Sequence, residues 1–189
     1  MTKEQKKIIV VDDNSANLTA CKNTLKPYYE VYPVPSAKKM FDLLEHVMPD
    51  LVLLDVDMPE INGYEAAGKL KKDEAFSGIP IIFLSGRVDP KSEMFGLNMG
   101  ALDYIHKPFV SELLLKRIET HLSLIENKKI VEERNRSLKE MCDPMNELTG
   151  LLRTARETKD PGKIEECLNR AEGVSKDLLA LIGAITGNQ

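Results

Sequence analysis

Short apolar runs alternate with helix-like stretches through the first 120 residues of the chain. Three of these runs read KIIVV at 7–11, LVLL at 51–54 and IPIIFL at 79–84. Continuous apolar runs of this length, flanked by helical patterns, are typical of strands buried on both faces. Five successive repeats of strand and helix therefore predict an α/β fold, with a parallel sheet covered by helices on both sides.

The element boundaries follow from caps and breakers. We expect strands at 7–11, 30–34, 51–54, 79–84 and 103–105. We expect helices at 14–25, 36–46, 64–71 and 89–99, and a further helix from Ser111 onward. Ser36 and Ser111 are candidate N-caps, whereas Pro27 and Gly100 mark helix ends.

Polar residues follow four of the expected strands. Asp12 and Asp13 follow the first strand, Asp55 the third, Ser85 the fourth, and Lys107 lies shortly after the fifth. Open parallel sheets bind ligands outside the carboxyl ends of their strands. We therefore expect these five side chains to form one site. The alternative, that each acidic loop end is merely solvated, explains any one residue but poorly explains all five.

The residue types of this predicted site suit phosphoryl transfer to a carboxylate. Clustered carboxylates repel one another unless a cation neutralises them, and Mg2+ prefers oxygen ligands. Asp12 or Asp13, together with Asp55 and a loop carbonyl, would suit Mg2+, with Mn2+ as the alternative. One carboxylate can then attack phosphorus. Lys107 can balance the charge of the phosphoryl oxygens, and Ser85 can donate a hydrogen bond to one of them.

Residues 5–120 closely resemble the receiver domains of two-component response regulators. The resemblance rests on VVDDN at 10–14, DLVLLDVDMPEINGYE at 50–65, IIFLSG at 81–86 and GALDYIHKPF at 100–109. It implies a flavodoxin-like, doubly wound, five-stranded parallel sheet of strand order 2-1-3-4-5. It also implies two-component signalling, in which a sensor histidine kinase or a phosphotransfer protein is the partner that donates phosphate. The N-terminal segment MTKEQKKIIVVDD turns acidic where a secretory signal needs a long apolar core, so we expect a cytoplasmic location.

The same resemblance implies a role for each residue of the acidic site. Asp55 would be the phosphoacceptor and a metal ligand. Asp12 and Asp13 would be the acidic pair, with Asp13 preferred as the direct ligand of Mg2+. Asp57 would give its backbone carbonyl to the metal ion.

The resemblance further implies a switch on the neighbouring strands. Lys107 would pair with Asp55 or with the phosphoryl group, and the peptide bond before Pro108 would be cis. Ser85 and Tyr104 would be the switch pair, with the hydroxyl turning toward the phosphoryl group and the ring turning inward. Taken alone, Tyr104 could equally be a half-buried aromatic residue of a strand.

A heptad pattern extends the last helix beyond the expected end of this domain. Its stripe comprises Leu124, Val131, Leu138, Met145 and Leu152, with Met141, Leu148 and Ala155 at intervening positions. The turn KDPG at 159–162 precedes a second helix that starts at Asp160 or Pro161. We therefore expect two domains: a receiver at 1–122, and a helical dimerisation domain at 123–189 that is continuous with the last receiver helix.

A lone helical hairpin buries little apolar surface, whereas two hairpins form a four-helix bundle. We therefore predict a homodimer through these coiled-coil helices, with packing onto the receiver of the same chain as the alternative. The stretches 138–152 and 163–185 resemble the dimerisation and phosphotransfer (DHp) domain of histidine kinases. Lys139 stands where that family has its phosphoacceptor histidine, and residues 122–189 contain no histidine. The resemblance thus implies the architecture without kinase chemistry. An unrelated coiled coil remains the other interpretation.

Charge and apolar content exclude several classes of function. Residues 1–120 carry 15 Lys/Arg and 18 Asp/Glu, and residues 121–189 carry 11 and 12. Neither part has the basic excess of a nucleic-acid-binding module. No apolar run is long enough to span a membrane. We expect a response regulator that switches protein contacts and catalyses only its own phosphorylation and dephosphorylation. The alternatives are a phosphate sink in a phosphorelay, or a dimeric adaptor for a histidine kinase.

Overall fold

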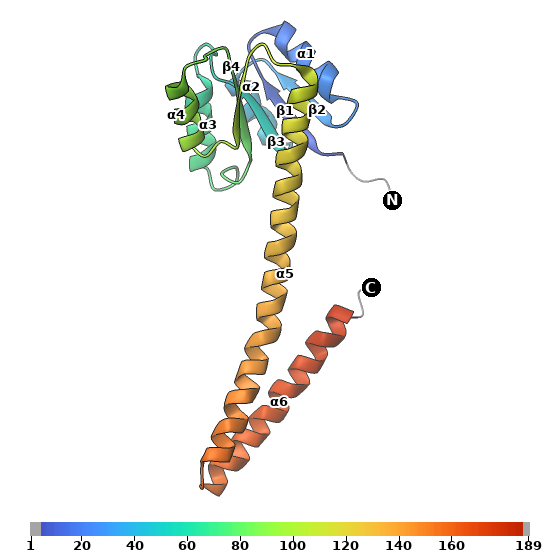
Figure 1. Ribbon diagram of the computed structural model, residues 1–189, viewed down its shortest axis with the longest axis vertical. Coiled ribbons are helices and arrows are strands. Elements are labelled where there is room, and N and C mark those ends of the chain that lie inside the picture. Colours follow the sequence, from blue (N-terminus) through green and yellow to red (C-terminus); the bar gives the residue numbers. More distant parts are fainter. Residues whose placement is uncertain (1–4, 187–189) are drawn as a thin grey trace. The chain divides into compact units, whose positions relative to one another are not determined.

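A computed structural model describes residues 5–186, without the side chains of Met141, Ile185 and Thr186 (Figure 1). The part that Met141 was expected to play in the heptad pattern therefore lies outside the described residues. The chain divides into two compact units, Met1–Leu124 and Ile125–Gln189. Each unit is described by itself.

The first unit contains a five-stranded parallel sheet. Its strands are β1 (Lys7–Val11), β2 (Glu30–Val34), β3 (Leu51–Asp55), β4 (Ile81–Ser85) and β5 (Asp103–His106). Their order in the sheet is β2-β1-β3-β4-β5, which confirms the predicted flavodoxin-like topology. The fourth strand begins two residues later than expected, although the carbonyl of Pro80 still accepts a hydrogen bond from the amide of Val52 (2.9 Å).

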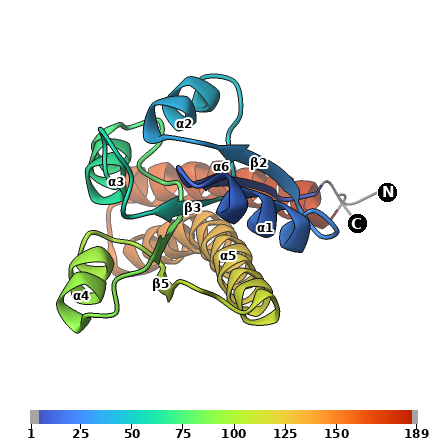
Figure 2. The same cartoon turned by 90° about the horizontal axis from the view of Figure 1, so that it is seen from above.

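Helices cover both faces of this sheet (Figure 2). On one face, alternate strand side chains pack against α2 (Ala37–Leu44) and α3 (Gly63–Lys72). On the other face, the remaining strand side chains pack against α1 (Ser15–Leu25) and the first turns of α5 (Ser111–Glu157). Every residue of β3 and β4 is shielded from solvent, so these central strands are buried on both faces of the sheet. This explains why those two strands are continuously apolar up to their last residues.

Local capping sets where the helices start. Ser36 accepts a hydrogen bond from the amide of Lys39 (3.3 Å), and the helix it caps ends at Leu44 rather than at His46. Asp89 caps α4 (Pro90–Asn98), with proline at its first position. After α4 the chain turns through Gly100, whose φ of 86° favours glycine.

Strand β2 forms one edge of the sheet and contains Pro33. The amide of Glu30 donates to the carbonyl of Lys6 (3.0 Å), and the carbonyl of Val34 accepts from the amide of Asp12 (3.2 Å). Both ends of β2 are therefore tied inward to the segment that contains β1.

The second unit is a helical hairpin made by the later turns of α5 and by α6 (Pro161–Thr186). Asp160 starts α6, because its carboxylate accepts the amide of Gly162 (3.0 Å). Ala171 of α6 is buried, and Arg170 pairs with Glu147 of α5 (2.7 Å). The two helices thus contact each other as the heptad pattern predicted.

Several large apolar side chains of this hairpin remain exposed. They are Leu138 (56%), Met145 (52%), Leu152 (49%), Leu168 (51%) and Leu179 (66%). Within residues 5–186, no helix is long and apolar enough to cross a membrane.

Candidate functional site

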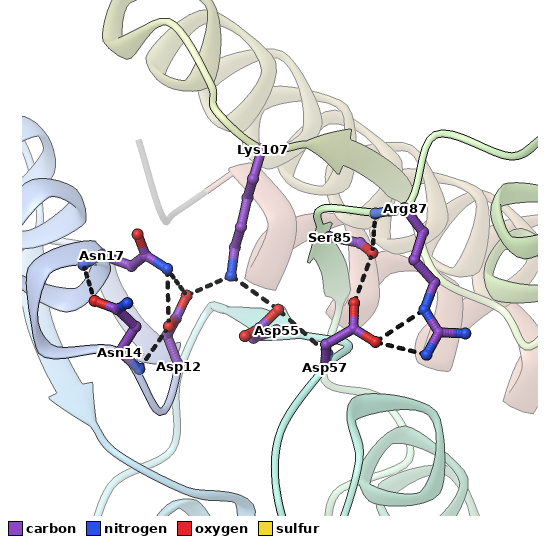
Figure 3. A network of polar contacts seen from close by, with 8 residues as sticks. All are labelled: Asp12, Asn14, Asn17, Asp55, Asp57, Ser85, Arg87 and Lys107. Carbon is purple, nitrogen blue, oxygen red and sulfur yellow. Dashed lines mark hydrogen bonds and ion pairs between the residues drawn. The ribbon is translucent and has the colours of Figure 1, made fainter.

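Polar side chains meet at the carboxyl edge of the sheet (Figure 3). Asp12 follows β1, Asp55 ends β3, Ser85 ends β4, and Lys107 follows β5. Asp12, Asp55 and Ser85 are the charged or polar side chains that are buried in the described part of the chain. Burial of two carboxylates within an apolar sheet is costly unless they are paired. These side chains therefore form one polar site at the carboxyl ends of the strands, where it was predicted.

Lys107 joins the two buried carboxylates. Its Nζ atom lies 2.6 Å from Oδ2 of Asp12 and 2.8 Å from Oδ1 of Asp55. Burial alone would lower the pKa of Lys107, but its hydrogen bonds to both carboxylates raise it above its usual value. The ammonium group therefore stays charged at neutral pH. Lys107 is the residue before a cis peptide bond to Pro108, which the resemblance to receiver domains implied.

The loop after β1 holds the carboxylate of Asp12. The amide of Asn14 donates to Oδ1 of Asp12 (2.9 Å), and the side-chain amide of Asn17 lies 3.1 Å from both oxygens. Asn14 in turn caps α1 by accepting the amide of Ala16 (2.9 Å). The start of α1 thus fixes the orientation of Asp12.

Asp12, Asp13 and Asp55 can each offer a carboxylate oxygen, and these oxygens lie within 4.8 Å of one another. Asp13 is exposed, whereas the other two are buried. Burial raises the pKa of Asp55, although Lys107 opposes this effect. An all-oxygen donor set, with more negative charge than one lysine balances, fits a hard divalent cation such as Mg2+. The amide of Asp57 lies 3.4 Å from Oδ1 of Asp55, so its backbone runs beside the candidate ligands.

Arg87 is a residue of this site that the sequence reasoning missed. Its guanidinium nitrogens lie 2.8 Å and 2.6 Å from Oδ1 of Asp57. Its backbone amide donates to Oγ of Ser85 (3.0 Å), and that hydroxyl is 3.5 Å from Oδ2 of Asp57. The available signal was a cation two residues after Ser85, in a loop at the same edge of the sheet.

The response regulator receiver domain family matches residues 8–119, which is more than half of the chain. The chain belongs to the response regulator receiver family. Its acidic pocket is the metal and phosphorylation site of such a domain, and the triad of Asp12, Asp13 and Asp55 is typical of the Mg2+ site in receivers.

Solved receiver structures share this fold. A CheY-like receiver domain protein from Methanospirillum hungatei JF-1 is 31% identical, covers 66% of this chain and 99% of its own, and gives a TM-score of 0.61. The beryllofluoride-activated receiver domain of DrrB is 29% identical, covers 63% of this chain and 98% of its own, and gives a TM-score of 0.58.

A probable cyclic di-GMP phosphodiesterase from Vibrio cholerae is 38% identical over 128 residues. That match covers 68% of this chain but 29% of the relative. The chain therefore spans less than a third of the length of this relative.

The remaining predicted residues are placed as follows. Tyr104 lies on β5 with 2% of its surface exposed, so its ring is turned inward rather than half-buried. In the sheet register Tyr104 pairs with Phe83, two residues before Ser85 on the neighbouring strand. Lys139 lies in the second unit on α5, where its side chain is exposed.

Proposed function

We propose that Asp55 is the phosphoacceptor of this receiver and that a partner histidine kinase or phosphotransfer protein supplies the phosphoryl group. One observation carries the proposal: a buried carboxylate whose Oδ1 lies 2.8 Å from the Lys107 ammonium, within a triad of carboxylates. A carboxylate held in this way can act as a nucleophile, and the surrounding cationic charge can stabilise the transferred group.

Each residue of the site has its own role in the phosphoryl transfer. An oxygen of Asp55 forms a bond to phosphorus as the bond between phosphorus and the donor's imidazole nitrogen breaks, and the imidazole leaves with the electron pair. Lys107 balances the charge that moves onto the phosphoryl oxygens, and the Ser85 hydroxyl donates a hydrogen bond to one of them. Mg2+ bound by Asp13 or Asp12, by Asp55 and by the Asp57 carbonyl would supply further positive charge.

Intact mass spectrometry tests the acceptor. The full chain is incubated with acetyl phosphate and Mg2+, and we expect a mass gain of one phosphoryl group. The gain should disappear in Asp55→Asn and persist in Asp42→Asn, which changes an exposed carboxylate of α2. A phosphoryl group retained by Asp55→Asn would refute the assignment. The lifetime of the product then separates a switch from a phosphate sink, since a sink requires rapid hydrolysis.

We further propose that residues 1–122 are the receiver and that residues 123–189 dimerise with a second copy as a four-helix bundle. The supporting observation is that Leu138, Met145 and Leu152 recur at seven-residue intervals on α5 and that each has about half of its surface exposed. Leu168 and Leu179 extend this exposed apolar set onto α6. A second hairpin with the same heptad spacing is complementary to such a surface.

Light scattering of matched variants tests the dimer. Leu152→Glu places a charge within the stripe and should shift the mass toward a single chain. Gly150→Glu introduces the same charge two residues away, where a side chain meets open space, and should leave the dimer intact. A wild-type protein that scatters as a single chain at micromolar concentration would overturn the proposal.

The proposed output of phosphorylation is a change in protein contacts, without DNA binding. Leu114, Ile118 and Leu122 of α5 pack against one face of the sheet, and later turns of the same helix carry the exposed stripe.

The dimerisation segment, residues 123–189, resembles the DHp domain of histidine kinases but has Lys139 at the histidine position. A lysine side chain has no imidazole ring, so Lys139 cannot act as the phosphoacceptor histidine of that family. We therefore assign this segment to assembly, with a histidine kinase as its binding partner. The test is whether a phosphoryl mimic changes dimer geometry or kinase binding, and no change in either would contradict this output.

A further inference from the structure

Tyr64 lies at a junction of three elements close to the acidic site. It is the second residue of α3, and its hydroxyl is 3.0 Å from the carbonyl oxygen of Ser92 on α4. The same hydroxyl lies 3.4 Å from the hydroxyl of Tyr104 on β5. A single hydroxyl thus contacts the backbone of α4 and the hydroxyl of Tyr104 on β5.

The start of α3 rests directly on the end of β3. A Cβ atom on Gly63 would lie 2.2 Å from the carbonyl oxygen of Asp55 and 2.9 Å from the Cα atom of Val56. The amide of Gly63 also donates to the carbonyl of Val56 (3.0 Å). Tyr64 is the next residue, so it lies one peptide bond away from this close contact with the backbone of Asp55.

Aromatic contacts hold the ring of Tyr64 in place. Its centroid lies 5.1 Å from that of Phe83 on β4 and 5.0 Å from that of Phe95 on α4, with interplanar angles of 69° and 87°. These are the edge-to-face arrangements that aromatic pairs prefer. A Cβ on Gly96 would lie 3.0 Å from Phe83 and 3.1 Å from Tyr104, so the absence of a side chain there lets α4 approach this cluster closely.

The two phenols act together because each has a single proton. The Ser92 carbonyl can only accept, so Tyr64 donates its one proton there, and Tyr104 must donate to the Tyr64 oxygen if both contacts are hydrogen bonds. Burial raises the pKa of Tyr64, and the neighbouring Tyr104 raises it further. Tyr64 therefore keeps its proton at neutral pH, and the chain of hydroxyls between β5 and α4 stays intact.

We propose that Tyr64 is a third positioning residue of the switch, which holds the Tyr104 ring inward and ties α4 to the strand end that carries Asp55. In this arrangement the state of Asp55 reaches α4 through Gly63 and Tyr64, in parallel with the Ser85 and Tyr104 pair. The inference rests on the proposed role of Asp55 as phosphoacceptor.

The first test uses Tyr64→Phe in the full chain, because this change keeps the ring contacts and removes only the hydroxyl. Beryllofluoride with Mg2+ serves as the phosphoryl mimic. We expect about fivefold weaker binding, the equivalent of one hydrogen bond between neutral groups. Tyr32→Phe is the control, because it removes a tyrosine hydroxyl from the edge strand β2, where its partner is Glu30, and should leave the affinity unchanged.

Hydrogen exchange gives a second measurement that needs no ligand. Loss of the bond to the Ser92 carbonyl should speed exchange of the amides in the first turns of α4, and Tyr32→Phe should not. In a double-mutant cycle, the losses of beryllofluoride affinity caused by Tyr64→Phe and Tyr104→Phe should be less than additive, because both changes remove the hydrogen bond between the two phenols.

The outcomes separate this inference from the proposed function. Failure of the wild-type protein to bind beryllofluoride at Asp55 would refute the acceptor assignment, and the exchange measurement would still decide the role of Tyr64. Normal affinity in Tyr64→Phe, unchanged exchange in α4 or full additivity with Tyr104→Phe would each overturn the inference.

Discussion

Lys107 holds its ammonium nitrogen 2.8 Å from Oδ1 of Asp55, and the same nitrogen lies 2.6 Å from the carboxylate of Asp12. One cation is thus shared by two buried anions, Asp55 at the end of β3 and Asp12 directly after β1. The arrangement keeps Asp55 oriented while leaving net negative charge for a divalent cation to balance.

Loss of the Lys107 cation should slow the phosphorylation of Asp55. We expect Lys107→Met to reduce the rate with acetyl phosphate by about 100-fold, the usual effect of removing one group that stabilises transition-state charge. Lys107→Arg, which keeps the charge but not the compact ammonium, should retain more activity. The measurement is mass gain against time. Equal rates in the methionine variant and the wild-type protein would show that Lys107 does not contact the transferred group.

Removal of the Arg87 cation should make the surface beside the acidic site more negative. Arg87 pairs with Asp57 at 2.6 Å, and 53% of its side chain is exposed. We expect Arg87→Met to slow phosphorylation by the anionic donor acetyl phosphate by roughly severalfold, with a weaker dependence on salt concentration. Arg87→Lys should behave like the wild-type protein. A faster rate in Arg87→Met would mean that the ion pair instead restrains the site.

Gly63 should not tolerate a side chain, since its Cβ would lie 2.2 Å from the carbonyl oxygen of Asp55. We expect Gly63→Ala to lower the free energy of unfolding by about 2–3 kcal/mol, because the strand end or the helix start must shift. Gly78→Ala is the matched control, because a Cβ there meets no atom within 4 Å. Urea denaturation measures both variants, and equal losses would show that the close approach is not the cause.

The ion pair between Asp103 and Arg117 predicts a pH-dependent stability. Burial alone would raise the pKa of Asp103, but hydrogen bonds from Arg117, the Tyr104 amide and His121 lower it below its usual value. A carboxylate with a lowered pKa stabilises the fold above the unfolded pKa of about 3.9, and this contribution is lost as the pH falls through the folded pKa.

We therefore expect Arg117→Met to lower the free energy of unfolding by about 0.5–1 kcal/mol at neutral pH, a modest value because 41% of the arginine side chain is exposed. The difference from wild type should vanish in acid below the pKa of Asp103. Lys116→Met, which removes a neighbouring cation with 73% of its side chain exposed, should have little effect at any pH. Urea denaturation across this pH range checks the prediction, and a difference that persists in acid would contradict it.

The sheet and the carboxylate cluster could be predicted because both follow from local patterns. Continuous apolar runs such as LVLL define strands, and parallel topology then brings Asp12, Asp55 and Ser85 to one edge without any knowledge of their contacts. The start of α2 was also predictable, because Ser36 caps this helix. The end of α2 was not, because the helical pattern continues to His46 beyond the last helical residue, Leu44.

Contacts between distant polar side chains lay beyond the sequence patterns. Arg87 reaches Asp57 across 30 positions, and Tyr64 reaches Tyr104 across 40. Such pairs depend on the loop geometry and on the direction in which each side chain points, and neither has a periodic signal. The predicted homodimer is a different case, because it depends on a second chain and stays a prediction.

The proline in the edge strand limits how the sheet can grow. Hydrogen-bonding directions alternate along a strand, and Glu30 and Val34 both bond inward, so the backbone nitrogen of Pro33 faces away from β1. That nitrogen has no proton, which leaves a gap in the row of donors that a strand from another molecule would need. The missing donor hinders aggregation through strand pairing at this edge of the receiver. This protection is an advantage because the proposed dimer would bring two such sheets into one assembly.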